Sequence, residues 1–219
     1  MKRAILLGSL ALVLGLGPSS ASADTIFSLN TEGCSLGCNV LPAGTVTLHQ
    51  NGANDVTVTV QLVDDYSFRD GNQNHWSFVF DLANSIGSTM ATNINGFGQT
   101  FSYVGFGNYS DPPLGSFQYA FECTTCTPGG NAGTTTQKLS FDLVATGLTE
   151  ASFISNGNYY FGVDVVGLTQ AAGIGQTGNI GATGPGTPRT PSVPEPSSLM
   201  LLGTGLTAIG GMLRRRMTA

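Results

Sequence analysis

Residues 56–62 read Val56-Thr57-Val58-Thr59-Val60-Gln61-Leu62, an unbroken alternation of apolar and polar side chains. Successive side chains of a β-strand point to opposite faces, so the valines and Leu62 face one way while the threonines and Gln61 face the other. The pattern predicts a strand with one buried face and one face open to water.

The same alternation recurs along the chain, and turn-forming residues such as Asn51-Gly52 and Asp111-Pro112-Pro113 separate the segments. It is clearest in residues 76–82, 139–143 and 159–165, and weaker in residues 25–30, 45–50, 100–105 and 116–122. A long helical periodicity is not evident before the C-terminal tail. About eight such strands predict an all-β domain, either an antiparallel β-sandwich or a jelly roll.

The predicted domain covers residues 24–172, and the composition then changes. Residues 173–192 are rich in Gly, Thr and Pro and nearly lack large apolar side chains. Such a segment offers little apolar surface to bury, so we expect a flexible linker there.

The charge of the predicted domain differs from that of the whole chain. Residues 24–172 hold twelve of the thirteen acidic residues but only two of the eight basic ones, Arg69 and Lys138, which gives a net charge of −10. Binding to nucleic acid requires clustered Lys and Arg against phosphates, so this composition argues against a nucleic-acid partner. The negative charge is instead suited to keeping the domain soluble and dispersed.

Four cysteines form two closely spaced pairs, Cys34 with Cys38 and Cys123 with Cys126. In a reducing compartment this spacing would point to zinc, but in an oxidising compartment an even number of cysteines favours disulfides. Three pairings are possible. Proximity favours the two local pairs, whereas crosswise pairs would close loops of about 90 residues and contribute on the order of 4 kcal/mol.

No catalytic signature is evident in the chain. The two histidines, His49 and His75, belong to no cluster with metal-ligand spacing, and a G-x-S-x-G motif is absent. We therefore expect a protein that is not an enzyme and has no cofactor. A glycoside hydrolase that pairs Asp64 or Asp65 with Glu122 or Asp164 is a lesser alternative.

A short run of oxygen-bearing side chains is a candidate calcium site. Asp64, Asp65 and Asp70 lie close together in the sequence, and Asn72 and Asn74 follow. Calcium prefers hard oxygen ligands, but the run lacks the spacing of an EF-hand. A plain turn is the favoured interpretation of this segment.

A carbohydrate-binding surface is the second functional hypothesis. Sugar-binding modules use exposed aromatic rings with neighbouring amides. The aromatic candidates are Tyr66, Phe97, Tyr103, Phe106, Tyr109 and Tyr119. Residues 95–109 concentrate Phe, Tyr and Gly, although most of these rings are expected to pack in the core or in turns.

The N-terminus has the three parts of a secretory signal peptide. Lys2 and Arg3 are followed by the apolar residues 4–17 and by Ala21-Ser22-Ala23, a small-residue cleavage site. We expect signal peptidase to remove residues 1–23, so that the mature chain begins at Asp24.

The C-terminus also has three parts in a fixed order. Val193-Pro194-Glu195-Pro196 favours an extended backbone, the apolar residues 199–213 would form a helix of about 22 Å, and Arg214-Arg215-Arg216 follow. The helix is near the lower limit for crossing a membrane. The arginines would remain in the cytoplasm and leave the rest of the chain outside.

This tail, residues 193–219, resembles that of the PEP-CTERM proteins, a tail also called the ice-binding protein C-terminal domain. The resemblance implies an exosortase-like transpeptidase as partner, cleavage near Pro194-Glu195-Pro196, and an inner-membrane intermediate on the way to the cell surface or extracellular matrix. Residues 34–38 and 44–48, with residues 56–62, also resemble uncharacterised PEP-CTERM passengers. We therefore expect an exported, structural or adhesive envelope protein, with binding of exopolysaccharide as the alternative.

Overall fold

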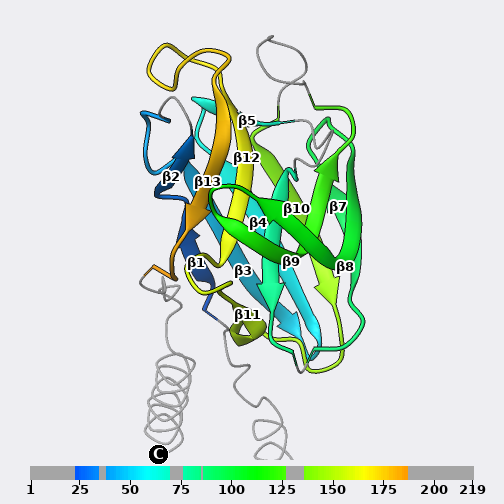
Figure 1. Ribbon diagram of the computed structural model, residues 1–219. Helices are drawn as coiled ribbons and strands as arrows, with labels where there is room; N and C mark the ends of the chain where they lie inside the picture. The colour runs from blue at the N-terminus through cyan, green and yellow to red at the C-terminus, as the bar shows by residue number, and fades with distance from the viewer. Residues whose placement is uncertain (1–22, 35–37, 70–75, 85, 127–135, 187–219) are drawn as a thin grey trace, which may run out of the picture. The chain divides into compact units, whose positions relative to one another are not determined.

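The computed structural model describes residues 23–34, 38–69, 76–84, 86–126 and 136–186. These residues form two antiparallel β-sheets packed face to face, as Figure 1 shows. The predicted all-β sandwich is confirmed. Residues 56–62 lie in β4 (Asp55–Leu62), where the valines are fully buried and Thr57 and Thr59 are half-buried.

The first sheet has five strands, and their polar side chains line its open face. Its strands in spatial order are β1 (Thr25–Ser28), β3 (Gly44–Gly52), β4, β10 (Lys138–Val144) and β7 (Met90–Asn95). Thr47, Thr59 and Ser140 lie in one row across the three central strands. This row of hydroxyls keeps the open face hydrated, because each strand buries only its other face.

The second sheet has eight strands. Six follow one path, in the order β2 (Thr31–Cys34), β13 (Thr177–Ala182), β12 (Phe161–Gly167), β6 (Phe78–Leu82), β9 (Gly115–Cys123) and β8 (Phe101–Asp111). Two short strands lie off this path: β5 (Tyr66–Phe68) pairs with β12, and β11 (Phe153–Ile154), after the short 3₁₀ helix η1 (Glu150–Ser152), pairs with β6.

Aromatic rings fill the space between the sheets. The rings of Phe121 in β9 and Phe141 in β10 have centroids 4.1 Å apart, and the Phe78 ring lies 6.1 Å from Phe141. Phe78 also stacks on Phe161 of the neighbouring strand β12. These contacts join the inner faces of the two sheets into one core.

The eight-stranded sheet is also covered on part of its outer face. Alternation in residues 76–82 predicts one buried face, but every residue of β6 is buried. The reason is the β8–β9 hairpin, which crosses in front of β12 and β13 in Figure 1. The hairpin and β6 together form a second apolar cluster, which we call the outer cluster. It consists of Val79 from β6 and of Tyr109, Leu114, Phe117 and Ala120 from the hairpin, with Trp76 and Tyr159 packed against them.

The prediction of a linker beginning at residue 173 was wrong. Residues 177–182 form β13, which pairs with both β12 and β2 inside the eight-stranded sheet. Its Ile180 is fully buried in the core. The glycines of this strand allow neighbouring groups to approach closely: a Cβ at Gly181 would lie 2.6 Å from the Tyr159 ring. The domain thus continues at least as far as residue 186, and residues 187–192 of the predicted linker lie outside the described residues.

The cysteines form the two local disulfides, Cys34–Cys38 and Cys123–Cys126, with Cα atoms 5.7 Å and 5.5 Å apart. The pairing that proximity favours is thus the pairing of the structure. One bridge follows β2 at the edge of the eight-stranded sheet, and the other follows β9. Both therefore stiffen the ends of strands rather than join distant parts of the chain.

Candidate functional site

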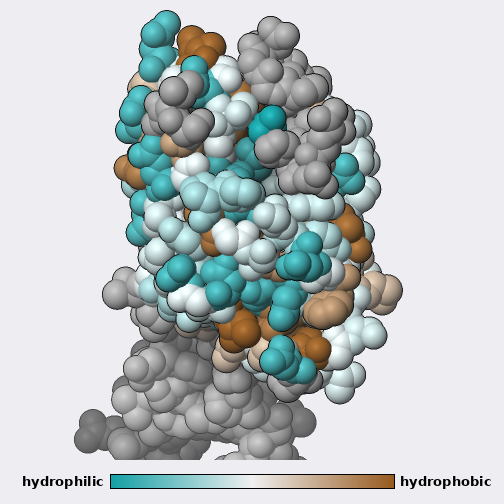
Figure 2. Space-filling model, in the orientation of Figure 1, coloured by the Kyte–Doolittle hydropathy of each residue, from teal (hydrophilic) through white to brown (hydrophobic). Residues whose placement is uncertain are grey.

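A cleft of about 490 Å³ lies between the loop after β6 and the β8–β9 hairpin. The loop contributes Ala83, Asn84, Ile86, Gly87, Ser88 and Thr89, and the hairpin contributes Phe106, Gln118 and Tyr119. Figure 2 shows a largely hydrophilic molecular face with hydrophobic side chains gathered toward its lower edge. The cleft lining mixes an aromatic ring with amides and hydroxyls.

Among the residues that the structure describes, Phe106 is the most exposed large hydrophobic residue, with 74% of its surface accessible. Its ring packs edge to face on Tyr119 at a centroid distance of 5.6 Å, and the buried Tyr119 ring stacks on Phe80 in the core at 5.2 Å. The exposed Phe106 ring is therefore held in place by two buried aromatic rings, Tyr119 and, beneath it, Phe80. A ring held in this way loses little side-chain entropy when a ligand stacks on it.

Hydrogen bonds fix the polar lining beside this ring. The Gln118 backbone N–H donates to Asp81 Oδ1 at 2.5 Å, and burial raises the pKa of the Asp81 carboxyl. The hydroxyls of Thr89 and Tyr103 are hydrogen-bonded to each other, and burial raises the pKa of Tyr103 to about 12. Tyr103 therefore stays neutral at physiological pH and acts in positioning Thr89.

The side chains that line the cleft are suited to contacts with a ligand. None of the lining residues is Asp, Glu, Lys, Arg, His or Cys, and the titratable side chain among them is the Tyr119 phenol, whose pKa is raised by burial. One exposed aromatic ring beside the side chains of Asn84, Gln118 and Ser88 can stack on an apolar ring face and hydrogen-bond to hydroxyls. That combination fits a sugar ring.

The structure gathers few of the aromatic sugar-binding candidates in this cleft. Tyr66 and Tyr109 are buried, and Tyr103 is half-buried behind Thr89. Phe97 is 47% exposed, but it does not line the cleft, and the Lys138 ammonium lies 4.6 Å from its ring centroid. Phe106 and Tyr119 are the candidates that line it. Sequence analysis missed the amides and hydroxyls because Asn84, Ser88 and Thr89 come from a loop without any motif, and Gln118 comes from a distant strand, β9.

The predicted calcium and hydrolase residues do not form a common site in the described regions. Asp64 is exposed, Asp65 accepts a hydrogen bond from Thr169, and Asp70 lies outside the described residues. Among the residues that the structure describes, no three His, Cys, Asp or Glu side chains gather as metal ligands. Asp164 is buried and paired with Arg69, so it is closed to a substrate.

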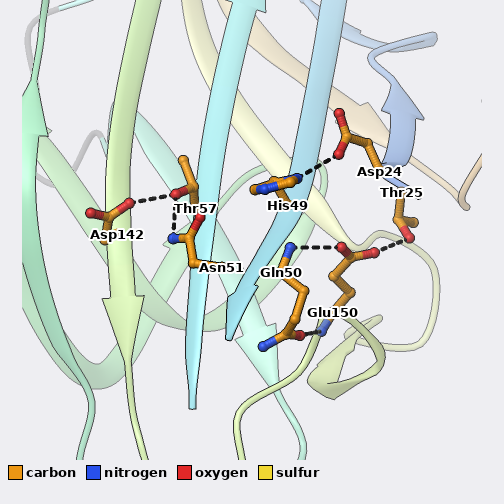
Figure 3. Close-up of polar contacts among 8 residues, drawn as sticks. All are labelled: Asp24, Thr25, His49, Gln50, Asn51, Thr57, Asp142 and Glu150. Carbon is orange, nitrogen blue, oxygen red and sulfur yellow. Dashed lines mark hydrogen bonds and ion pairs between the residues drawn. The ribbon is translucent and has the colours of Figure 1, made fainter. Parts of the chain in front are cut away.

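Polar contacts also join residues at the edge of the five-stranded sheet, as Figure 3 shows. The Glu150 carboxylate accepts hydrogen bonds from the Gln50 backbone N–H at 2.9 Å and from the Thr25 hydroxyl, and the Gln50 side chain accepts from the Glu150 N–H at 3.1 Å. These contacts fasten η1 to β1 and β3. His49 pairs with Asp24 at 2.7 Å on the same sheet, and His75 lies outside the described residues.

Comparison with known proteins gives one match. Residues 192–216 match the model of the PEP-CTERM protein-sorting motif, and this confirms the identification of the tail. The motif implies processing by an exosortase, and proteins that carry it are exported and sorted to the cell surface. Searches of curated proteins and of solved structures found no match.

The two ends of the chain, residues 1–22 and 187–219, lie outside the described residues. The signal-peptide cleavage site at Ala21-Ser22-Ala23, the apolar residues 199–213 and the basic residues 214–216 therefore remain sequence predictions in structural terms, although the motif implies a helix in the tail. In the parts of the chain that the structure describes, no helix is long and apolar enough to span a membrane.

Proposed function

We propose that this chain is an exported, non-enzymatic structural or adhesive protein of the cell envelope or extracellular matrix, released from its membrane intermediate by an exosortase. One observation carries the proposal: the sorting motif at residues 192–216 begins six residues after residue 186, the last residue of the sandwich that the structure describes. The mature product is then the sandwich with only a short C-terminal extension.

The surface and chemistry of the domain support a non-catalytic role. The carboxyl groups of Asp65, Asp164 and Glu150 are engaged with neighbouring groups, and none of the residues that line the cleft is Asp, Glu, Lys, Arg or His. The net charge of −10 over residues 24–172 favours dispersion of an exported protein. The two local disulfides are suited to an oxidising compartment.

The test is the intact mass and peptide map of the mature protein from its own envelope, without reduction. We expect a chain that begins at Asp24 and ends near Pro194-Glu195-Pro196. A strain without the exosortase should keep the tail through Arg216. The sorting proposal fails if the strain with an active exosortase also yields a chain that ends at Ala219.

A second candidate function, binding of an exopolysaccharide, is favoured by the cleft alone. The exposed Phe106 ring on its Tyr119 support, with Asn84 and Gln118 alongside, provides a stacking face and hydrogen-bonding groups. Affinity electrophoresis in gels that contain the organism's exopolysaccharide tests this function. The Phe106→Ala variant should lose the retardation, and the Phe97→Ala variant, changed at an exposed ring outside the cleft, should keep it. Equal retardation of both variants and the wild type would exclude the cleft as the binding site.

A further inference from the structure

Three polar side chains meet under the β8–β9 hairpin, on the outer face of the eight-stranded sheet. Asp164 in β12 and Asn179 in β13 are register partners on neighbouring strands, so their side chains leave the sheet side by side, about 5 Å apart. Asp111 lies at the end of β8, where the hairpin folds over. Its Oδ2 atom lies in the space above Gly162 that a side chain would otherwise fill.

All three side chains are buried: 2% of Asp111, 1% of Asp164 and 5% of Asn179 is exposed. Within the described residues, Asp111 Oδ2 and Asn179 Oδ1 receive no hydrogen bond. A buried oxygen without a partner costs about 1–3 kcal/mol, and more when it carries charge. Two such atoms in one place therefore indicate that a group outside the polypeptide completes the cluster.

The orientation of the Asn179 amide is fixed by the hairpin. Its Nδ2 atom donates, at 2.7 Å, to the carbonyl oxygen of Pro112, which is the residue next to Asp111. Exchanging the two amide atoms would place two acceptors against each other, so the oxygen is the end without a donor. The hairpin tip also lies close to the neighbouring strand β2, because a Cβ at Gly33 of β2 would lie 2.8 Å from the Pro113 ring.

The charges of the cluster favour a cation. Asp111 and Asp164 repel each other, and Arg69 lies 3.4 Å from Asp164 Oδ2, so the ionised cluster carries one net negative charge. Burial and then the charge of Asp164 raise the pKa of Asp111 to about 8. Burial also raises the pKa of Asp164 to about 7, against the opposing effect of Arg69.

The donor set identifies the class of cation. The cluster offers carboxylate and amide oxygens, without a thiolate or imidazole among these side chains, and hard oxygen donors select Ca²⁺ or Mg²⁺ over zinc and copper. Magnesium demands near-ideal octahedral geometry and keeps its water, whereas calcium accepts irregular sets of oxygen ligands. Three ligands from three strands, with water completing the shell, fit calcium better.

We propose that Asp111, Asp164 and Asn179 form a calcium site that fastens the tip of the β8–β9 hairpin to the outer face of the eight-stranded sheet. The site is separate from the sequence-predicted candidates Asp64, Asp65 and Asp70. Arg69 offsets part of the negative charge, so the site belongs to the weak class of extracellular calcium modules, with a dissociation constant on the order of 10⁻⁴–10⁻³ M.

The test uses the mature exported protein, stripped with EDTA and then titrated with CaCl₂ by isothermal calorimetry and thermal unfolding. We expect calcium to bind and to raise the unfolding temperature, and MgCl₂ to do so much less. The Asp111→Asn variant, which keeps the shape but removes the charge, should bind calcium at least about tenfold more weakly. The control variant Asp142→Asn changes an acid on the opposite sheet and should bind like the wild type.

A crystal structure grown with calcium provides the second readout and does not depend on stability. Metal–oxygen distances of about 2.3–2.6 Å at the three side chains would confirm the site. A density peak at hydrogen-bonding distances of about 2.7–3.2 Å would identify a buried water only and overturn the proposal. Equal calcium responses in the wild type and the Asp111→Asn variant would overturn it as well.

Discussion

Leu114, at the tip of the β8–β9 hairpin, packs against the bare backbone of Gly162 in β12. A Cβ at position 162 would lie 3.0 Å from Leu114 Cδ1 and 2.8 Å from Val79 Cγ2. The absence of a side chain at Gly162 thus lets the hairpin tip approach the outer face and bury the outer cluster.

Replacing Gly162 with alanine should destabilise the domain. The added methyl group must displace the Asp111 carboxyl, which is its nearest neighbour, as well as Val79 and Leu114, and such overpacking costs about 1–3 kcal/mol of the free energy of unfolding. Urea denaturation followed by tryptophan fluorescence measures the loss. The control is Gly52→Ala, because a Cβ there has no neighbour within 4 Å, and its change should stay within about 0.5 kcal/mol. Equal stability of the two variants would mean that the hairpin tip is not packed on β12.

The inner faces of the sandwich were predictable because period-two alternation is a local signal. Val58 and Val60 in β4 and Phe141 in β10 point inward from strands whose other face is polar. The outer cluster was not predictable in this way. Val79 occupies the phase that alternation assigns to solvent, and it is buried only because a distant hairpin folds over it. That relationship depends on the bend of the hairpin and on glycines such as Gly162, neither of which has a periodic signature.

The candidate sites divide along the same line. The sorting tail was predictable, because its three parts follow one another in the sequence. The cleft was only partly predictable: Phe106 lies in the aromatic stretch 95–109, but its support Tyr119 comes from the next strand. Strand β13 was missed because Gly and Thr carry no apolar pattern, and the strand places just two apolar residues in the core, Ile180 and Ala182.

The end of the folded domain can be tested by truncation. A chain that ends at residue 172 lacks β13, so β12 and β2 lose their shared partner and Ile180 leaves the core. We expect this chain to lack a cooperative unfolding transition, and a chain that ends at residue 186 to keep one. Circular dichroism during thermal unfolding distinguishes them. Cooperative unfolding of both chains at the same temperature would show that β13 adds nothing to the domain.

The contacts of Glu150 should contribute to stability through backbone hydrogen bonds. In the Glu150→Ala variant, the Gln50 N–H loses its acceptor and the Thr25 hydroxyl loses its partner. We expect a loss of about 1–2 kcal/mol in the free energy of unfolding. The Glu150→Gln variant keeps one carbonyl acceptor and should lose less. Hydrogen exchange at the Gln50 amide provides a local measurement, and exchange that is unchanged in Glu150→Ala would contradict the contact.

Reduction of the disulfides should destabilise the protein only moderately. Cys34–Cys38 and Cys123–Cys126 close very short loops, for which loss of chain entropy accounts for about 2 kcal/mol per bridge. Crosswise bridges would close loops of about 90 residues and contribute between about 4 and 5 kcal/mol each. Non-reducing peptide mapping should recover the two local pairs. Urea denaturation with and without reductant should show that reduction lowers the free energy of unfolding by about 2 kcal/mol per bridge. A decrease of about 4–5 kcal/mol per bridge would contradict local pairing.

Asp142 on the open face of the five-stranded sheet should titrate below its ordinary range. The Thr57 hydroxyl donates to Asp142 Oδ1 at 2.5 Å and the Asn93 amide donates to Oδ2 at 2.6 Å, and these bonds lower the pKa of the carboxyl. The folded state therefore favours the ionised form. This contribution to stability is present above the unfolded pKa and is lost as the pH falls through the folded pKa.

Replacing Thr57 with valine removes the first of these donors, so the pKa of Asp142 should rise toward its ordinary value and the stability lost in acid should shrink. A carbon-detected NMR titration of the Asp142 carboxyl measures the pKa directly. The control is Thr59→Val on the same strand, where the hydroxyl contacts Ser140 at 3.2 Å, and Asp142 should titrate there as in the wild type. If Asp142 titrates identically in Thr57→Val and wild type, the Thr57 bond does not stabilise the carboxylate, and the lowered pKa must come from Asn93 and the other neighbours of Asp142.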